Sequence, residues 1–155
     1  MGDGPFRAPG AGRTIGPMQA DPARSGPLRV VVIDADERVR ESLAGLLCIG
    51  DQLCVVGSAG QTAPAIDIVA ATQPDIVVLD PRLPEADAGL TLIGRIRSVA
   101  PGARILIMSG TDPNEQSDLV GSADGFVRKT FRPSELVAAV LAASRTLDLP
   151  ASETA

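Results

Sequence analysis

The sequence predicts an α/β fold in which helices cover both faces of one parallel sheet. Short apolar runs alternate with segments of helical periodicity from residue 28 to about residue 146. The run 75–80 is apolar except at its ends, and a proline flanks it on each side. An unbroken apolar strand is typical of a parallel sheet that is buried on both faces. The expected fold class is therefore a doubly wound α/β sheet.

Five strands and five helices account for the alternation. The strands are expected at 29–33, 52–58, 75–80, 103–108 and 125–128. Helices are expected at 37–48, 63–72, 90–99 and, with a weaker pattern, 113–121, and Pro133 opens a last helix because proline suits the first helical position. Right-handed crossovers then favour the flavodoxin-like strand order 2-1-3-4-5.

Helical spacing also predicts which side chains face the core. The expected inward residues include Leu43 and Leu47, Ile66, Val69 and Ala70, and Leu90, Ile93 and Ile96. The two cysteines, Cys48 and Cys54, both lie in apolar stretches, so we expect them to be reduced core residues.

Composition limits the classes of function. The chain has 155 residues, which suits one domain, and its net charge is −5. No stretch interleaves basic and aromatic residues, so we expect no direct nucleic-acid binding. The chain contains no histidine, which excludes every His-dependent nucleophile or metal site within it. Any chemistry must come from carboxylates, hydroxyls and lysine.

The two ends of the chain differ from its middle. Residues 1–27 are rich in glycine and proline and are expected to form a disordered arm. Residues 28–147 are the expected folded domain, and 148–155 a flexible tail. No apolar run reaches the roughly 20 residues of a membrane span, and no signal-peptide core is present. We therefore expect a cytoplasmic protein without a membrane partner.

Four polar residues stand at the ends of predicted strands: Asp34, Asp80, Ser109 and Lys129. The carboxyl ends of parallel strands gather at one edge of the sheet. Clustered carboxylates hold a hard cation such as Mg²⁺, a carboxylate can attack phosphorus, and lysine with a hydroxyl neutralises a transferred group. Each residue alone has a plainer role as a cap or a solvated charge, but the four together indicate phosphoryl transfer.

Four runs of the chain resemble the receiver domains of two-component response regulators. They are VVVIDADERVRESL, PDIVVLDPRLP, ARILIMSG and GSADGFVRKTFRPSEL, and they cover about residues 28–146 in order. The last run is most similar to the subfamily whose receivers usually precede a helix-turn-helix output domain. Only nine residues follow Thr146, so we expect a stand-alone receiver.

The resemblance implies that Asp80 accepts a phosphoryl group from the phosphohistidine of a sensor histidine kinase. It also implies that Asp34, Asp80 and the backbone carbonyl of Arg82 bind Mg²⁺. The family carries two adjacent acids after the first strand, whereas Ala35 follows Asp34 here. The missing acid should weaken Mg²⁺ binding, unless the strand continues and Asp36 shares a face with Asp34.

The resemblance further implies a switch. Ser109 is the hydroxyl that follows the phosphoryl group, Phe126 is the aromatic residue that turns inward with it, and Lys129 is the ion-pair partner of the phosphoacceptor. The segment between Ser109 and Gly125 is shorter than the family pattern and contains Gly121. This departure predicts a more mobile or altered switch.

Three functions remain open at this point. The first is a phosphorylated receiver that signals to an unknown downstream protein and is not an enzyme beyond its own phosphorylation and dephosphorylation. The second is a degenerate receiver that binds its partner without phosphorylation. The third is a haloacid-dehalogenase-like phosphatase with Asp34 as nucleophile and Asp36 as acid/base, although it lacks a later acidic pair and leaves Asp80 unexplained. Whether the chain forms a homodimer is also open.

Overall fold

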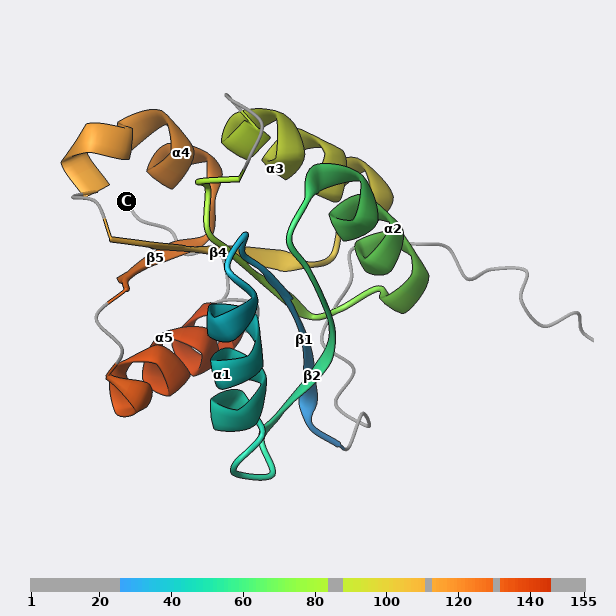
Figure 1. The fold of residues 1–155 in the computed structure, drawn as a ribbon, viewed down its shortest axis with the longest axis vertical. Helices are drawn as coiled ribbons and strands as arrows, with labels where there is room; N and C mark the ends of the chain where they lie inside the picture. The colour runs from blue at the N-terminus through green and yellow to red at the C-terminus, as the bar shows by residue number, and fades with distance from the viewer. Residues whose placement is uncertain (1–25, 84–87, 111–112, 130–131, 146–155) are drawn as a thin grey trace, which may run out of the picture.

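The computed structural model describes residues 26–83, 88–110, 113–129 and 132–145. Its strands form one sheet in the order β2-β1-β3-β4-β5 (Figure 1). The pairing between neighbouring strands is parallel throughout. The strands are β1 (Leu28–Ile33), β2 (Leu53–Ala59), β3 (Ile76–Leu79), β4 (Arg104–Ser109) and β5 (Gly125–Arg128). The predicted fold class and strand order are confirmed.

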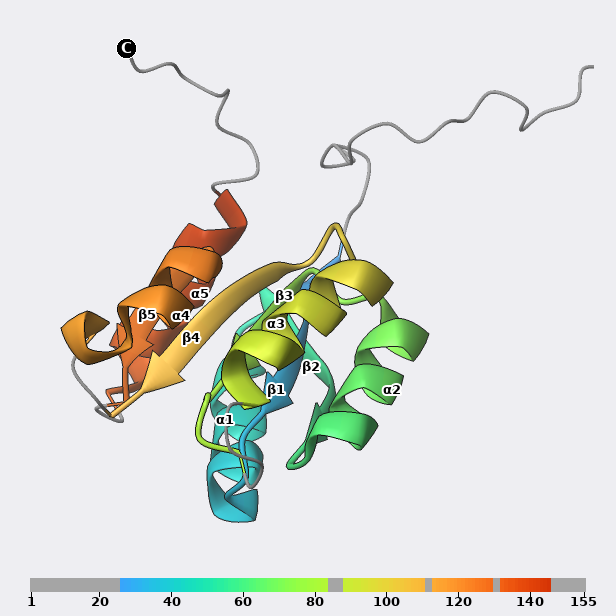
Figure 2. The same ribbon diagram turned by 90° about the horizontal axis from the view of Figure 1, so that it is seen from above.

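Helices cover both faces of this sheet. They are α1 (Glu37–Leu47), α2 (Thr62–Thr72), α3 (Ala88–Val99), α4 (Ser117–Ser122) and α5 (Pro133–Arg145), and a 3₁₀ turn at Pro113–Gln116 precedes α4. Helices α1 and α5 lie on one face, and α2, α3 and α4 lie on the other (Figure 1). Figure 2 shows α2 and α3 side by side, as their contacts require.

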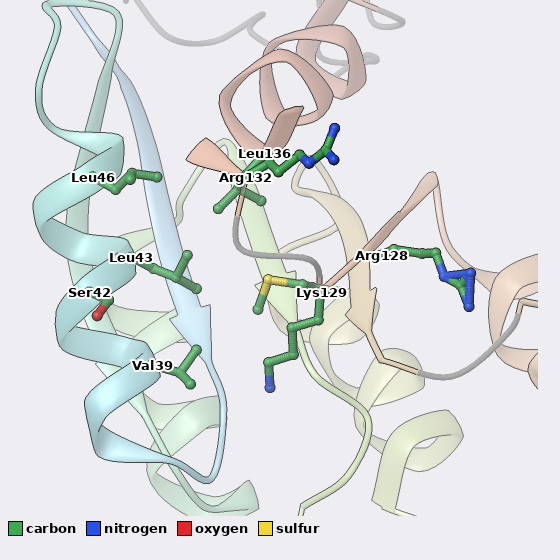
Figure 3. Close-up of a pocket in the computed structure, with 9 residues that line it drawn as sticks. Val39, Ser42, Leu43, Leu46, Arg128, Lys129, Arg132 and Leu136 are labelled. Carbon is green, nitrogen blue, oxygen red and sulfur yellow. The ribbon is translucent and has the colours of Figure 1, made fainter. Parts of the chain in front are cut away.

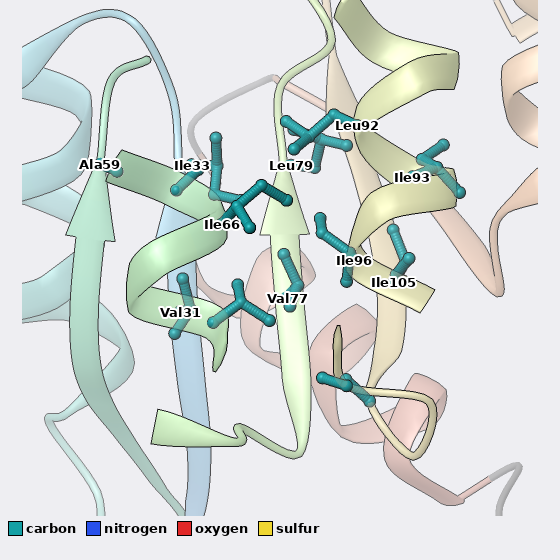
Figure 4. Packing of buried hydrophobic residues seen from close by; sticks show 14 of the residues in the cluster. Val31, Ile33, Ala59, Ile66, Val77, Leu79, Leu92, Ile93, Ile96 and Ile105 are labelled. Carbon is teal, nitrogen blue, oxygen red and sulfur yellow. The ribbon is translucent and has the colours of Figure 1, made fainter. Parts of the chain in front are cut away.

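The two faces of the central strands belong to two separate cores. Successive side chains of a strand point to opposite faces. Val31 and Ile33 of β1 therefore pack under α2 and α3 (Figure 4), whereas Val30 and Val32 pack under α1 and α5. All four of these residues, and all of β3, are fully buried. Burying one such side chain is worth about 1.5–3 kcal/mol, so β1 and β3 form a rigid base for the residues that follow them.

Two predicted core positions are wrong in the helices. Leu90 is 46% exposed, while Leu92 is completely buried. The inward stripe of α3 therefore runs through Leu92, Ile93 and Ile96, and Leu90 lies outside it. In α2 the predicted Ala70 is exposed and Ala65 is buried instead, because Ala65 is one turn before Val69 on the inward face.

The cysteines are free thiols, but Cys48 is not a core residue. Cys48 is exposed and Cys54 is half-buried. Cys48 caps the C-terminus of α1, and its Sγ accepts a hydrogen bond from Val55 N at 3.2 Å. The apolar surroundings of Cys48 in the sequence therefore do not imply burial.

The predicted arm and tail cannot be compared with the structure. Residues 1–25 and 146–155 lie outside the described residues, as do residues 84–87 after β3. None of the helices in the described ranges is long and apolar enough to cross a membrane.

Candidate functional site

The register of β1 and β3 places two aspartates beside each other. Ile33 pairs with Leu79 at the ends of these strands, so Asp34 and Asp80 leave the sheet together. Asp80 N donates to the carbonyl of Ile33 at 2.9 Å, and Asp34 N donates to the carbonyl of Ala59 at 3.0 Å. Both residues are buried, with 2% and 5% of their surface exposed. Two carboxylates in such a position require a cation.

Lys129 supplies this cation from the end of β5. Its Nζ lies 2.8 Å from Asp34 Oδ2 and also donates to Asp80 Oδ2. The backbone N of Lys129 donates to the carbonyl of Ser109 at 2.9 Å, which fixes where the side chain begins. In Figure 3 the side chains of Lys129 and Arg128 extend in different directions, as expected for neighbours in a strand.

The electrostatic balance keeps Lys129 charged. Burial of the ammonium group lowers its pKa, but the hydrogen bonds to Asp34 and Asp80 and their negative charges raise it by more. The net result is a pKa above the ordinary value of 10.5. Lys129 is also the only lysine in the chain. A lysine-specific titration signal or chemical modification therefore reports on this site.

Each carboxylate binds its own loop with its second oxygen. Asp34 Oδ1 accepts a hydrogen bond from Asp36 N at 2.8 Å, and Asp80 Oδ1 accepts one from Arg82 N at 2.8 Å. These contacts are Asx turns, in which an aspartate bonds to the backbone two residues on. Both carboxylates are therefore held in place by a turn on one side and by Lys129 on the other.

Asp36 has a different task from Asp34. It is the N-cap of α1, and its Oδ1 accepts a hydrogen bond from Arg38 N at 2.9 Å. Ala35 and Asp36 are both exposed. Within the described ranges no three acidic, cysteine or histidine side chains are grouped to hold a metal ion. A role for Asp36 in metal binding stays a prediction.

The oxygen ligands of the site are of the type that Mg²⁺ prefers, but there are few of them. Carboxylate and carbonyl oxygens are the ligands that this hard cation prefers, and it is often held by only one or two carboxylates. Asp34, Asp80 and the Arg82 carbonyl match that chemistry. All four carboxylate oxygens of Asp34 and Asp80 already accept hydrogen bonds from protein groups.

The two predicted switch residues lie on the neighbouring strands. Ser109 ends β4 and is completely buried. Phe126 of β5 is half-buried and packs against the core on the α2–α3 face, as do Leu119 and Ala123. The structure thus brings Asp34, Asp80 and Lys129 into direct contact and places Ser109 next to them along the strand ends.

Sequence reasoning missed Arg40. This residue lies on α1, and its Nη1 donates to the carbonyl of Asp34 at 2.7 Å. The contact spans six residues and depends on the angle at which α1 leaves the sheet. Neither spacing nor composition could have indicated it.

The comparisons with known proteins identify the family. The model of the response regulator receiver domain matches residues 30–141, which include Asp34, Asp80 and Lys129. The chain belongs to the response regulator receiver family. Over 115 residues this receiver is 36% identical to the DNA-binding transcriptional activator DevR/DosR of Mycobacterium tuberculosis, covering 73% of this chain and 52% of that protein. The response regulator MprA of Mycolicibacterium vanbaalenii is 34% identical, with 77% and 51% covered.

Solved structures agree with this assignment. The signal receiver domain of NarL from Mycobacterium tuberculosis has a TM-score of 0.70 and 32% identity, with 78% of this chain and 98% of that chain covered. A LuxR-family response regulator from Aurantimonas has a TM-score of 0.70 and 30% identity, with 77% and 86% covered. The predicted family is confirmed. This receiver spans about half the length of the curated relatives it matches.

Proposed function

We propose that this receiver accepts a phosphoryl group on Asp80 from the phosphohistidine of a sensor histidine kinase. The observation that carries the proposal is the position of Asp80: it is 5% exposed, follows the central strand β3, and is held between Lys129 Nζ and Arg82 N. A carboxylate in this setting is oriented before the donor arrives, which lowers the entropic cost of reaction.

The reaction is a transfer between two side chains. An Asp80 carboxylate oxygen attacks phosphorus, the bond from phosphorus to the donor nitrogen breaks, and its electron pair stays on the imidazole. Lys129 is already in contact with Asp80 and would neutralise the charge of the transferred group. The Ser109 hydroxyl at the neighbouring strand end would then bond to a phosphoryl oxygen.

Mg²⁺ bound by Asp34, Asp80 and the Arg82 carbonyl would stabilise the charge on the phosphoryl oxygens. Ala35 stands where the resemblance to receiver domains implies a further acid. Loss of even an outer partner of a metal typically costs about 10- to 100-fold in affinity, so this receiver should bind Mg²⁺ more weakly than family members with both acids.

The output of the switch is a change in affinity for a protein. Movement of Ser109 toward the phosphoryl group would pull on β5, because the Ser109 carbonyl accepts the hydrogen bond from Lys129 N. Phe126 lies on the same strand and would change its packing with that movement. The net charge of −5 favours a protein partner over nucleic acid, and we propose that the receiver acts on a downstream protein.

A second function has specific support. Ala35 is exposed and Asp36 is engaged as a helix cap, so the acidic group around Asp34 is incomplete. A receiver with this deficit could bind its partner without being phosphorylated. The phosphatase alternative has no comparable support, because Asp36 serves the helix and the family match accounts for the motif around Asp80.

The intact mass of the protein after incubation with acetyl phosphate and Mg²⁺ tests the proposal. We expect the gain of one phosphoryl group. Asp80→Asn should abolish the gain, while Asp67→Asn, at an exposed aspartate of α2, should retain it. No gain in the wild-type protein, with a sensor kinase or with acetyl phosphate, would favour the phosphorylation-independent module.

A further inference from the structure

An arginine from α1 holds the backbone that carries Asp34. Arg40 Nη1 donates to the carbonyl of Asp34 at 2.7 Å and to the carbonyl of Ala35 at 3.4 Å. The backbone N of Arg40 donates to the carbonyl of Asp36 at 3.1 Å. Arg40 therefore donates hydrogen bonds to the carbonyls of all three residues, 34–36, that link β1 to α1.

The guanidinium lies in a place that only glycine leaves open. Gly60 follows β2, and a Cβ atom there would be 2.5 Å from Arg40 Nη1 and 3.3 Å from the Asp34 carbonyl oxygen. Any side chain at position 60 would push the end of Arg40 away. The contact between Arg40 and Asp34 thus depends on two segments, α1 and the end of β2, that are brought together by the fold.

Arg40 also changes the charge of the site. A guanidinium is charged at every pH that a protein survives. Asp34 and Asp80 are the acids, and Lys129 and Arg40 are the cations that bind them or their backbone. The formal charges of these four residues sum to zero. A divalent cation that enters between the two carboxylates therefore meets the Lys129 ammonium group at both of them and the Arg40 guanidinium at the backbone of Asp34.

We propose that Arg40 is a positioning residue for Asp34 that also sets the affinity of the site for divalent cations. Its hydrogen bonds fix the turn that carries Asp34, and its charge opposes the binding of Mg²⁺. This inference rests on the proposed function, because phosphoryl transfer to Asp80 is what the Mg²⁺ site would serve. Its test measures Mg²⁺ binding by the unphosphorylated protein, so the role of Arg40 and the phosphorylation of Asp80 can be refuted independently.

The test is a calorimetric Mg²⁺ titration at low ionic strength. Arg40→Gln removes the charge, and Arg95→Gln, at an exposed position of α3, is the matched control. We expect Arg40→Gln to bind Mg²⁺ about two- to tenfold more tightly than the wild type, and Arg95→Gln to change little. The difference should shrink in about 0.5 M NaCl, where the Debye length falls to a few ångströms. The same comparison is made in an Ala35→Asp background, where we expect the Mg²⁺ affinities of both proteins to be higher.

Gly60→Ala tests whether the location of the Arg40 guanidinium matters, because this variant leaves the net charge of the protein unchanged. This variant keeps Arg40 but displaces its guanidinium, so Mg²⁺ binding should tighten in the same direction as in Arg40→Gln. A loss of Mg²⁺ affinity in Arg40→Gln, in a variant whose circular dichroism shows a native fold, would mean that Arg40 only orders Asp34 and would overturn the electrostatic role. Unchanged affinity in both variants and both backgrounds would overturn the proposal as a whole.

Discussion

Replacement of Lys129 by methionine should destabilise the protein strongly. The change keeps most of the side-chain volume and removes a charge that both buried carboxylates contact. Breaking a buried ion pair costs about 3–5 kcal/mol, because a charge is left without its partner. The Lys129 side chain is 18% exposed, and water can partly replace the ammonium. We therefore expect a loss of about 2–4 kcal/mol in the free energy of unfolding at pH 7.

Urea unfolding followed by far-ultraviolet circular dichroism measures this loss, since the chain contains no tryptophan or tyrosine. Arg95→Met is the control and should change stability by less than about 0.5 kcal/mol, as is usual for exposed sites. A loss below about 1 kcal/mol in Lys129→Met would refute the reasoning, because it would show that Asp34 and Asp80 do not depend on the ammonium group.

The same ion pairs predict a pH dependence at the alkaline end. The pKa of Lys129 is raised in the folded protein, so its contribution is fully present below the unfolded value of 10.5 and is lost as the pH rises through the folded pKa. The stability difference between the wild type and Lys129→Met should be constant from pH 8 to about 10 and decrease above that. Labelling with [¹³Cε]lysine gives one signal, whose titration midpoint should exceed 10.5 in the folded protein. A midpoint at or below 10.5 would contradict the ion-pair account.

Three further substitutions test separate parts of the account. Ala35→Asp should raise the Mg²⁺ affinity at least about tenfold in a calorimetric titration, and unchanged binding would show that the missing acid is not the limiting ligand. Asp36→Ala should cost about 1 kcal/mol in urea unfolding through loss of the α1 cap, with little effect on Mg²⁺ affinity; a large loss of affinity would make Asp36 a ligand after all. Leu79→Ala should cost about 2–5 kcal/mol because it empties a fully buried position of β3, and a cost below about 1 kcal/mol would mean that β3 is not the rigid base of Asp80.

The order of the sheet could be predicted because its strands are recognisable in the sequence as short apolar runs. All four residues of β3 are apolar and fully buried, and proline residues mark both ends of that segment. Asp34 and Asp80 follow from the same pattern, since each is the first acid after a central strand. Long-range placement of Lys129 beside both of them required only the parallel order of the strands and its position after β5.

Other features depend on geometry that periodicity does not contain. The pattern through Leu90 fits a helix as well as the pattern through Leu92, and only the packing of α3 on the sheet decides between them. Asp36 could have shared a face with Asp34 in an extended chain, but the backbone turns at Ala35 and Asp36 begins a helix. The contact of Arg40 with Asp34 depends on the direction of α1 and on Gly60, which are properties of the folded chain.

The most direct test of the central claim is to locate the phosphoryl group. Borohydride reduces an acyl phosphate of aspartate to homoserine, which tandem mass spectrometry can assign to one residue. After treatment with a phosphodonor, we expect homoserine at position 80 and unchanged aspartate at positions 34 and 36. Homoserine at another acid, or at none while Mg²⁺ and a competent donor are present, would contradict the assignment of Asp80 as the phosphoacceptor.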